Sequence, residues 1–142
     1  MDKQKLYQSV EKSKDILTEL SDKIWSFAEL SMKEFKSAEY YCQVMEEQGF
    51  TVERQLCGIP TAFSGKYGTG KPVIGILGEF DALDGLSQEA GIAERKPLAG
   101  NTCGHGCGHN MLGAASLGAA MAIKEAITAG DLQGTVIFYG CP

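Results

Sequence analysis

Two continuous apolar runs flank a segment rich in small residues, and this arrangement restricts the fold more than any other feature. The runs PVIGILGEF (72–80) and GTVIFYG (134–140) are typical of strands buried on both faces. Between them, residues 110–129 carry helix-compatible apolar spacing, with Gly and Ala filling the other positions. Such a helix can lie very close to a sheet. The pattern therefore predicts an α/β layered domain.

The first half of the chain is predicted to be helical and is followed by two short strands. One apolar stripe covers residues 6–27, and a break is expected near ELSMKEF. A second helix is predicted from Ser37, as its N-cap, to Gln48, with Gly49 as its stop. The segments FTVERQL and TAFSGKYG alternate and are predicted as strands. We see no repeat or interdomain linker and expect one domain over residues 1–142.

Composition excludes several functions. The chain has 142 residues and a formal net charge of −5, which provides no basic surface for nucleic acid or for an anionic membrane. Its start lacks the apolar core of a signal peptide, and its longest weakly polar stretch (111–123) is too short to span a bilayer. Its five cysteines show no disulfide spacing. We expect a soluble, cytoplasmic protein without nucleic-acid or membrane partners.

One apparent nucleotide motif fails on inspection. The segment GKYGTGKP nearly matches the phosphate-binding loop pattern, but Pro72 stands where a hydroxyl must bind magnesium. A strand also follows it, whereas a phosphate loop opens a helix. We interpret the segment as a hairpin turn.

The segment CGHGCGH concentrates metal-binding side chains. It holds both histidines of the chain, His105 and His109, together with Cys103 and Cys107. Thiolate and imidazole are good zinc ligands. All four could close around one structural zinc only if the glycines let the loop curl tightly, because four alternate positions of extended chain cover roughly 20 Å.

A second interpretation uses Cys107 and His109 alone, immediately before the predicted helix. Reactive groups in α/β enzymes commonly lie at the edge of the sheet where strands end and helices begin. The remaining ligands would come from elsewhere, and Glu79, Asp81 and Asp84 follow a predicted strand. A metal site built from both segments is therefore the favoured hypothesis.

Two further interpretations remain open. Cys107 could be a nucleophile activated by His105 or His109 at the start of a helix, which would make the protein a cysteine hydrolase. The cluster could equally belong to a small non-enzymatic zinc-binding module, or be a glycine-rich loop with incidental cysteines.

Three segments also carry a family resemblance: GHGCGHNMLGAA, GILGEFDALDGLSQ and WSFAELSMKEFKSAEYYCQVMEEQGFTVE. They resemble the zinc-dependent exopeptidase and amidohydrolase family of aminoacylase, hippuricase and glutamate carboxypeptidase type. The branch that includes aminobenzoyl-glutamate hydrolase is the most similar, and the resemblance runs in order through the chain. It implies a three-layer α/β/α catalytic domain, with helices packed on a largely buried sheet.

The resemblance also implies site roles. The C-x-H metal ligands of this branch fall on Cys107 and His109. An aspartate that orients the metal site falls on Asp81, and Glu79 lies near a position where relatives carry a metal-binding histidine. Members use two divalent ions, zinc or manganese, to hydrolyse amide bonds of N-acyl or aminobenzoyl amino acids.

Two departures from the family pattern affect what we expect of this chain. Asp84 stands where the branch usually has proline. The general-base glutamate and a ligand glutamate of the family fall beyond Pro142. We therefore expect the N-terminal part of the catalytic domain, without the dimerisation domain and the C-terminal part. It should have little activity alone, and a homodimer or hetero-oligomer is expected only for the full-length protein.

Overall fold

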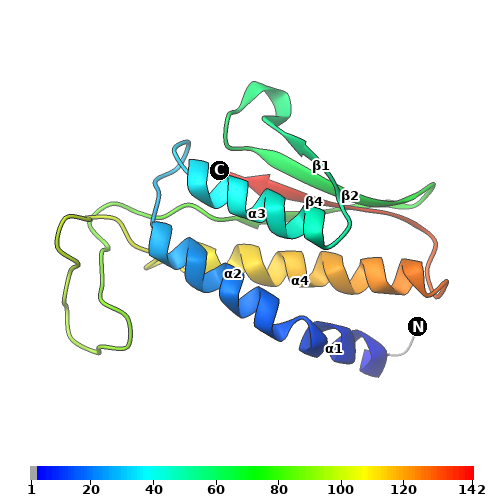
Figure 1. Ribbon diagram of the computed structural model, residues 1–142, viewed down its shortest axis with the longest axis horizontal. Coiled ribbons are helices and arrows are strands. Elements are labelled where there is room, and N and C mark those ends of the chain that lie inside the picture. The colour runs from blue at the N-terminus through cyan, green and yellow to red at the C-terminus, as the bar shows by residue number, and fades with distance from the viewer. Residues whose placement is uncertain (1–2) are drawn as a thin grey trace.

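The computed structural model describes residues 3–142 (Figure 1). Met1 and Asp2, which belong to the start that we expect to lack a signal peptide, lie outside the described residues. Helices precede strands in the first half, and the longest helix connects the last two strands. In order, the elements are α1 (Lys3–Lys12), α2 (Lys14–Phe27), α3 (Phe35–Glu47), β1 (Thr51–Arg54), the 3-10 turn η1 (Leu56–Gly58), β2 (Phe63–Thr69), β3 (Val73–Glu79), α4 (His109–Thr128) and β4 (Gly134–Cys141).

The four strands form one mixed sheet in the order β1-β2-β4-β3. β4 pairs antiparallel with β2 and parallel with β3. The turn at 70–72 is therefore not a hairpin as expected, because β4 lies between the two strands that it connects. The β3–α4–β4 unit supplies the long crossover that parallel strands require.

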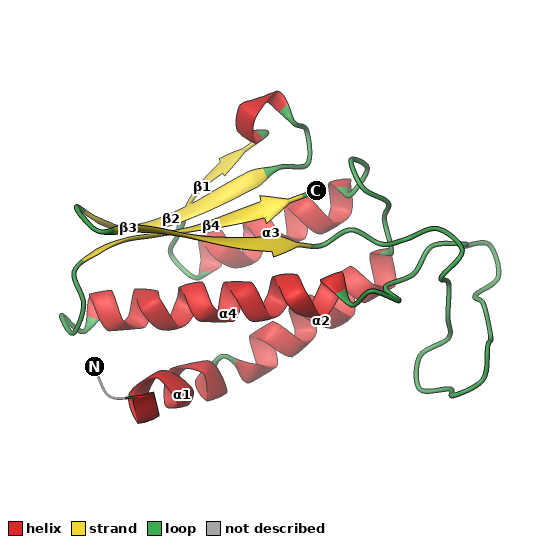
Figure 2. Cartoon of the chain, turned by 180° about the vertical axis from the view of Figure 1, so that it is seen from behind, coloured by secondary structure: helices red, strands yellow, loops and turns green. Residues whose placement is uncertain are grey.

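The helices that position the site pack on one face of the sheet. A Cβ at Gly65 of β2 would meet Met45 of α3, and one at Gly78 of β3 would meet Phe138 and the backbone of Gly113 in α4. α3 and α4 thus cover the same side, with α1 and α2 behind them (Figure 2). The expected α/β class is confirmed. Within residues 3–142 all four α-helices lie on the same side of the sheet, so the helical layer expected on its other face is not found there.

An aromatic cluster forms the centre of the core. Tyr41 of α3 packs against Phe63, Phe80 and Phe138 with ring centroids 5.5–6.0 Å apart, and all four side chains are at most 1% exposed. Burying each of the three phenylalanine side chains stabilises the fold by about 1.5–3 kcal/mol. Leu117 of α4 completes this contact and ties the crossover helix to the sheet.

The strand β3 is less buried than its sequence predicted. Val73 and Leu77 are 55% and 67% exposed. Alternation turns these residues away from Gly78, which faces α4. The continuous apolar run is real, but only one of its faces is covered by the described residues. The prediction of full burial holds better for β4, whose Val136 and Phe138 are 0% exposed.

Two helix boundaries also differ from the expectations. The first apolar stripe is divided into α1 and α2 at Ser13. α3 begins at Phe35, so Ser37 lies inside it rather than capping it. The break predicted near ELSMKEF (29–35) is found at 28–34, and the helix stop at Gly49, with its φ of 81°, is confirmed. No helix in the described part combines the length and apolarity needed to cross a membrane.

Candidate metal centre

The imidazole of His109 lies between two carboxylates at the carboxyl end of β3. His109 is the first residue of α4. Its Nδ1 lies 2.6 Å from Oδ1 of Asp81, and its Nε2 lies 3.0 Å from Oε2 of Glu79. Because a carboxylate can only accept, the short contact requires the Nδ1–H to donate to Asp81. The structure thus brings together three of the predicted site residues.

Backbone pairing places the segment that carries Asp81. The N–H of Ala82 donates to the carbonyl of Glu29 at 2.7 Å. Leu83 and Gly104 exchange two backbone hydrogen bonds of 3.0 Å each. These bonds join the Asp81 segment to the loop that carries His109, although 28 positions separate the two residues.

Cys107 lies in a tight turn directly before α4. The N–H of Gly108 donates to the carbonyl of His105 at 2.9 Å, and Gly108 has a φ of 83°, a conformation that glycine adopts without strain. The Cys107 side chain is exposed. Among residues 3–142, no hydrogen bond joins its thiol to either histidine, since His105 contacts Ile24 and His109 contacts Asp81 and Glu79.

The arrangement fits part of a metal centre. Imidazole and carboxylate are ordinary ligands of zinc and manganese, and a ligand histidine commonly donates its other N–H to a carboxylate, as His109 does to Asp81. Within the described residues, however, no three His, Cys, Asp or Glu side chains converge into a ready metal cage. The described residues therefore offer a partial donor set.

The other candidates of the cluster point elsewhere. His105 is 4% exposed, and its Nε2 lies 3.0 Å from the carbonyl oxygen of Ile24. Burial lowers the pKa of this imidazole below 6.5. Asp84 accepts a 2.6 Å hydrogen bond from Thr102, whose hydroxyl also lies 3.8 Å from the Cys103 sulfur. The structure does not bring the four cluster side chains around one point.

Sequence reasoning missed two glutamates that support the site. Glu29 accepts hydrogen bonds from Ser37 N, Ser37 Oγ and Lys36 N at 2.9–3.2 Å. Glu34 is 0% exposed. Burial raises the pKa of its carboxyl above 4.5, and the charge of Asp81 adds to the rise. Both lie in the segment predicted only as a break, where nothing in the local pattern separates a buried glutamate from a solvated one.

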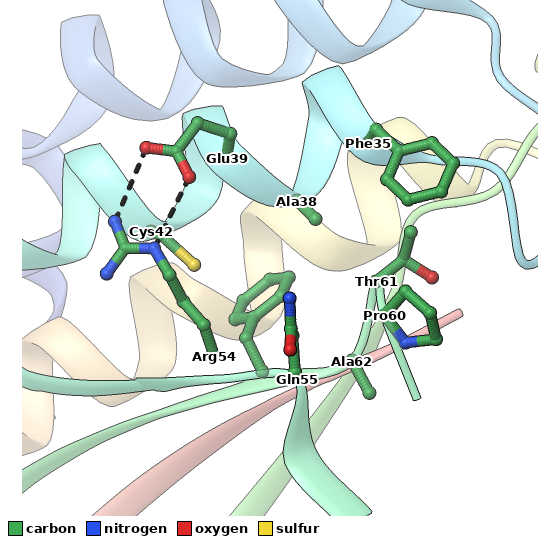
Figure 3. Close-up of a pocket in the computed structure, with 10 residues that line it drawn as sticks. Phe35, Ala38, Glu39, Cys42, Arg54, Gln55, Pro60, Thr61 and Ala62 are labelled. Carbon is green, nitrogen blue, oxygen red and sulfur yellow. Dashed lines mark hydrogen bonds and ion pairs between the residues drawn. The ribbon is translucent and has the colours of Figure 1, made fainter. Parts of the chain in front are cut away.

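A small cavity lies away from these residues, between α3 and the β1–β2 connection (Figure 3). Its volume is about 200 Å³, below the roughly 300 Å³ at which ligand pockets begin. Its one cation, Arg54, is already engaged by Glu39 and by Glu46. The cavity therefore offers neither the size nor a free charge for a ligand.

Comparison with known proteins agrees with the resemblance in the motifs. No protein-family model matches the chain. The chain is 46% identical over 134 residues to one subunit of the p-aminobenzoyl-glutamate hydrolase of Escherichia coli, a match that covers 94% of the chain and 28% of that protein.

Two solved structures share the fold. A dinuclear metal-binding peptidase from Bacillus subtilis superposes with a TM-score of 0.69 at 23% identity, covering 89% of the chain and 35% of the peptidase. An aminobenzoyl-glutamate utilization protein from Klebsiella pneumoniae gives 0.62 at 13% identity, covering 95% of the chain and 38% of that protein. The chain is thus similar in sequence to a p-aminobenzoyl-glutamate hydrolase subunit and shares its fold with a metal-binding peptidase, and it spans about a third of the length of the relatives it matches.

Proposed function

We propose that this chain supplies part of the metal centre of a hydrolase that cleaves the amide bond of N-acyl or aminobenzoyl amino acids. The observation that carries the proposal is the His109 imidazole held by Asp81 at 2.6 Å, with a second carboxylate on its other nitrogen. This is the pattern of an oriented metal-binding histidine.

Cys107 and His109 are the proposed metal ligands, and Glu79 is a further candidate. The intact enzyme would hold two divalent ions, zinc or manganese. A thiolate ligand favours zinc on softness grounds, whereas carboxylates suit manganese equally well. Bound metals of this kind polarise a carbonyl and lower the pKa of water toward neutrality.

The chain's own residues orient this centre. Asp81 accepts the Nδ1 proton of His109, so Nε2 is the ring nitrogen that would bind a metal, in place of its 3.0 Å contact with Glu79. The side chain of Asp81 is 14% exposed, which strengthens this hydrogen bond by excluding water. The exposed Cys107 and the half-exposed Glu79 lie where external groups can reach them.

Substrate and partners are proposed from the relatives. The Escherichia coli relative is named as one subunit of a p-aminobenzoyl-glutamate hydrolase, so aminobenzoyl-glutamate is our proposed substrate and a hetero-oligomer our proposed assembly. We also propose a cytoplasmic location, because all five cysteines are free thiols.

The chain alone should have little or no activity. Its two histidines include one that is buried against Ile24, and the described residues contain no complete cage. We propose that the general-base glutamate and the further ligands lie in sequence beyond Pro142.

The test is a metal titration combined with an assay. Cobalt(II) added to the purified chain should produce a thiolate-to-metal charge-transfer band that is lost in Cys107→Ser and in His109→Gln. Cys57→Ser, which removes an exposed thiol in η1, is the matched control and should keep the band. A band that survives Cys107→Ser would refute the ligand assignment.

The same samples test the expected inactivity. Release of p-aminobenzoate from p-aminobenzoyl-glutamate should be undetectable with zinc or manganese present. Turnover that scales with chain concentration and disappears in His109→Gln would show that the chain is a complete catalyst.

A further inference from the structure

His105 is the one buried polar side chain of the Cys103–His109 loop, and its ring binds α2. The Nε2–H donates to the carbonyl of Ile24 at 3.0 Å, because a carbonyl can only accept. The ring also packs beside Trp25, with centroids 6.2 Å apart. The side chain is 4% exposed and Ile24 is 0% exposed, so solvent does not compete for this hydrogen bond.

The acceptor lies in the last turn of α2, where helix carbonyls lack a full set of intrahelical partners. Ala28, the C-cap of α2, also donates to the Ile24 carbonyl, at 3.2 Å. His105 therefore adds a second donor at the end of α2. The contact joins residues 81 positions apart in sequence.

The backbone of His105 connects this contact to the ligand turn. Its carbonyl accepts from Gly108, which closes the turn that contains Cys107. On its other side, Gly104 is paired with Leu83. A Cβ at Gly104 would collide with the carbonyl of Leu86, so the loop has no room to shift there.

The end of α2 also holds the other half of the site. Glu29, two residues beyond α2, accepts from Ala82 at 2.7 Å, next to Asp81. The Asp81 segment and the Cys107–His109 turn are thus both attached to the stretch 24–29.

We propose that His105 is a positioning residue that sets the Cys107–His109 turn against Asp81 through its hydrogen bond to the end of α2. The proposal rests on the proposed function, since it gives His105 a role in a metal centre to which it contributes no ligand. Its Nδ1 is buried without a hydrogen-bond partner in the described part of the chain. Nε2 is therefore the ring atom through which His105 hydrogen-bonds to the described residues.

The side-chain amides of Gln and Asn provide the sharpest test. Gln places an N–H at nearly the reach of imidazole Nε2, whereas Asn is one methylene shorter and cannot reach Ile24. The variants are His105→Gln, His105→Asn and His105→Phe in the 142-residue chain. Val136→Ala is a control that weakens the core in β4, away from the site.

Two readouts are measured on each folded variant. The first is the cobalt(II) dissociation constant from the charge-transfer band. The second is the long-range ¹H–¹⁵N spectrum of the metal-free chain, in which His109 is the only remaining histidine of each His105 variant and is assigned without ambiguity.

We expect His105→Gln to bind cobalt within roughly threefold of the parent chain, and His105→Asn and His105→Phe to bind about 10- to 100-fold more weakly, the usual effect of losing a group that orients a ligand. The His109 ring signals should move toward those of a free imidazole only in the latter two. Val136→Ala should change neither readout.

Unchanged cobalt affinity and unchanged His109 signals in His105→Asn would overturn the proposal, as would an equal loss in Val136→Ala. If His105→Phe does not fold, the Gln and Asn pair decides. If the parent chain binds no cobalt, the proposed metal centre fails, and the His109 signals of the metal-free variants still support or refute the positioning role.

Discussion

The two carboxylates that flank His109 differ in burial, and this difference separates their roles. The Asp81 side chain is 14% exposed and the Glu79 side chain is 54% exposed. A hydrogen bond shielded from water orients a ring more strongly than an exposed one of similar length. We therefore propose that Asp81 fixes the His109 ring and that Glu79 is the carboxylate available to an incoming ion.

The first prediction tests Asp81. Asp81→Asn keeps the shape of the side chain but removes the charge that stabilises the Nδ1–H tautomer. We expect cobalt affinity to fall about 10- to 100-fold, measured by titration of the charge-transfer band. Asp84→Asn, which alters a more exposed carboxylate bonded to Thr102, should change it by less than about threefold. Equal losses in both would indicate a general effect of loop charge.

The second prediction concerns Glu34, whose buried carboxyl has a raised pKa. A carboxyl with a raised folded-state pKa binds its proton more tightly when folded than when unfolded. Its contribution to stability is therefore lost as the pH rises from the ordinary value of 4.5 to the raised value, and stays lost above it. Glu34→Gln removes this dependence.

Urea unfolding at pH 4 and at pH 7.5 measures the effect. The free energy of unfolding of Glu34→Gln minus that of the parent chain should be larger at pH 7.5 than at pH 4, which means that the substitution stabilises the fold more at the higher pH. Glu53→Gln, an exposed site on β1, should show no such difference. A parallel change at both pH values would mean that Glu34 is charged to the same extent in the folded and unfolded chain.

At this scale the sequence predicted residue types better than residue roles. The spacing of CGHGCGH alone could not distinguish His105 from His109, since both lie two positions from a cysteine; the preference for His109 came from its place before the predicted helix and from the family resemblance. Their roles are separated by contacts with Ile24 and Asp81, which lie 81 and 28 positions away. The loop pattern contains no information about either distant partner.

Among the elements, α3 depends on a cap that lies outside it. The Glu29 carboxylate accepts from the N–H groups of Lys36 and Ser37, which lack partners within the helix. A carboxylate at this position also interacts favourably with the helix dipole. The same residue contacts Ala82 through its backbone, so the cap and the site share one anchor.

The third prediction follows from this cap. Glu29→Gln should lower the free energy of unfolding by about 1–2 kcal/mol, because a charged acceptor is replaced by a neutral one at a helix N-terminus. Chemical denaturation checks the value. Glu53→Gln is again the matched control and should stay within about 0.5 kcal/mol of the parent chain. A loss of the same size in both variants would contradict the capping role.

The element types were predictable, and their arrangement was not. Periodicity located the helices and strands because each buries one face, and it located α4 nearly to the residue. The cap at Ser37 was wrong because a glutamate eight residues earlier serves the helix N-terminus instead. The insertion of β4 between β2 and β3 depends on the crossover through α4, which leaves no local signal.

For the whole molecule, the sheet has one covered face and one open face. Val73 and Leu77 of the edge strand β3 face away from the helices, and Ile137 and Tyr139 of β4 lie half-buried beside them. Only β4 pairs with β3 among the described strands, so its outer backbone edge is also unpaired. An apolar edge strand of this kind favours pairing between copies of a chain.

The fourth prediction is that the chain self-associates as its concentration rises and that Leu77→Lys suppresses this association. Lysine on an exposed edge strand opposes strand pairing by charge and desolvation. Because Leu77 is 67% exposed, its replacement should change the free energy of unfolding by no more than about 0.5 kcal/mol.

Sedimentation velocity over a range of concentrations separates these effects. Val10→Lys, at a 42% exposed position of α1, is the matched control, since it adds the same charge on a helix outside the sheet. Association reduced equally by both variants would point to net charge alone. Association reduced only by Leu77→Lys would locate the contact between copies on β3. Glu79 is the last residue of β3. A partner that covers this strand would therefore lie at the same edge of the sheet as the proposed metal centre.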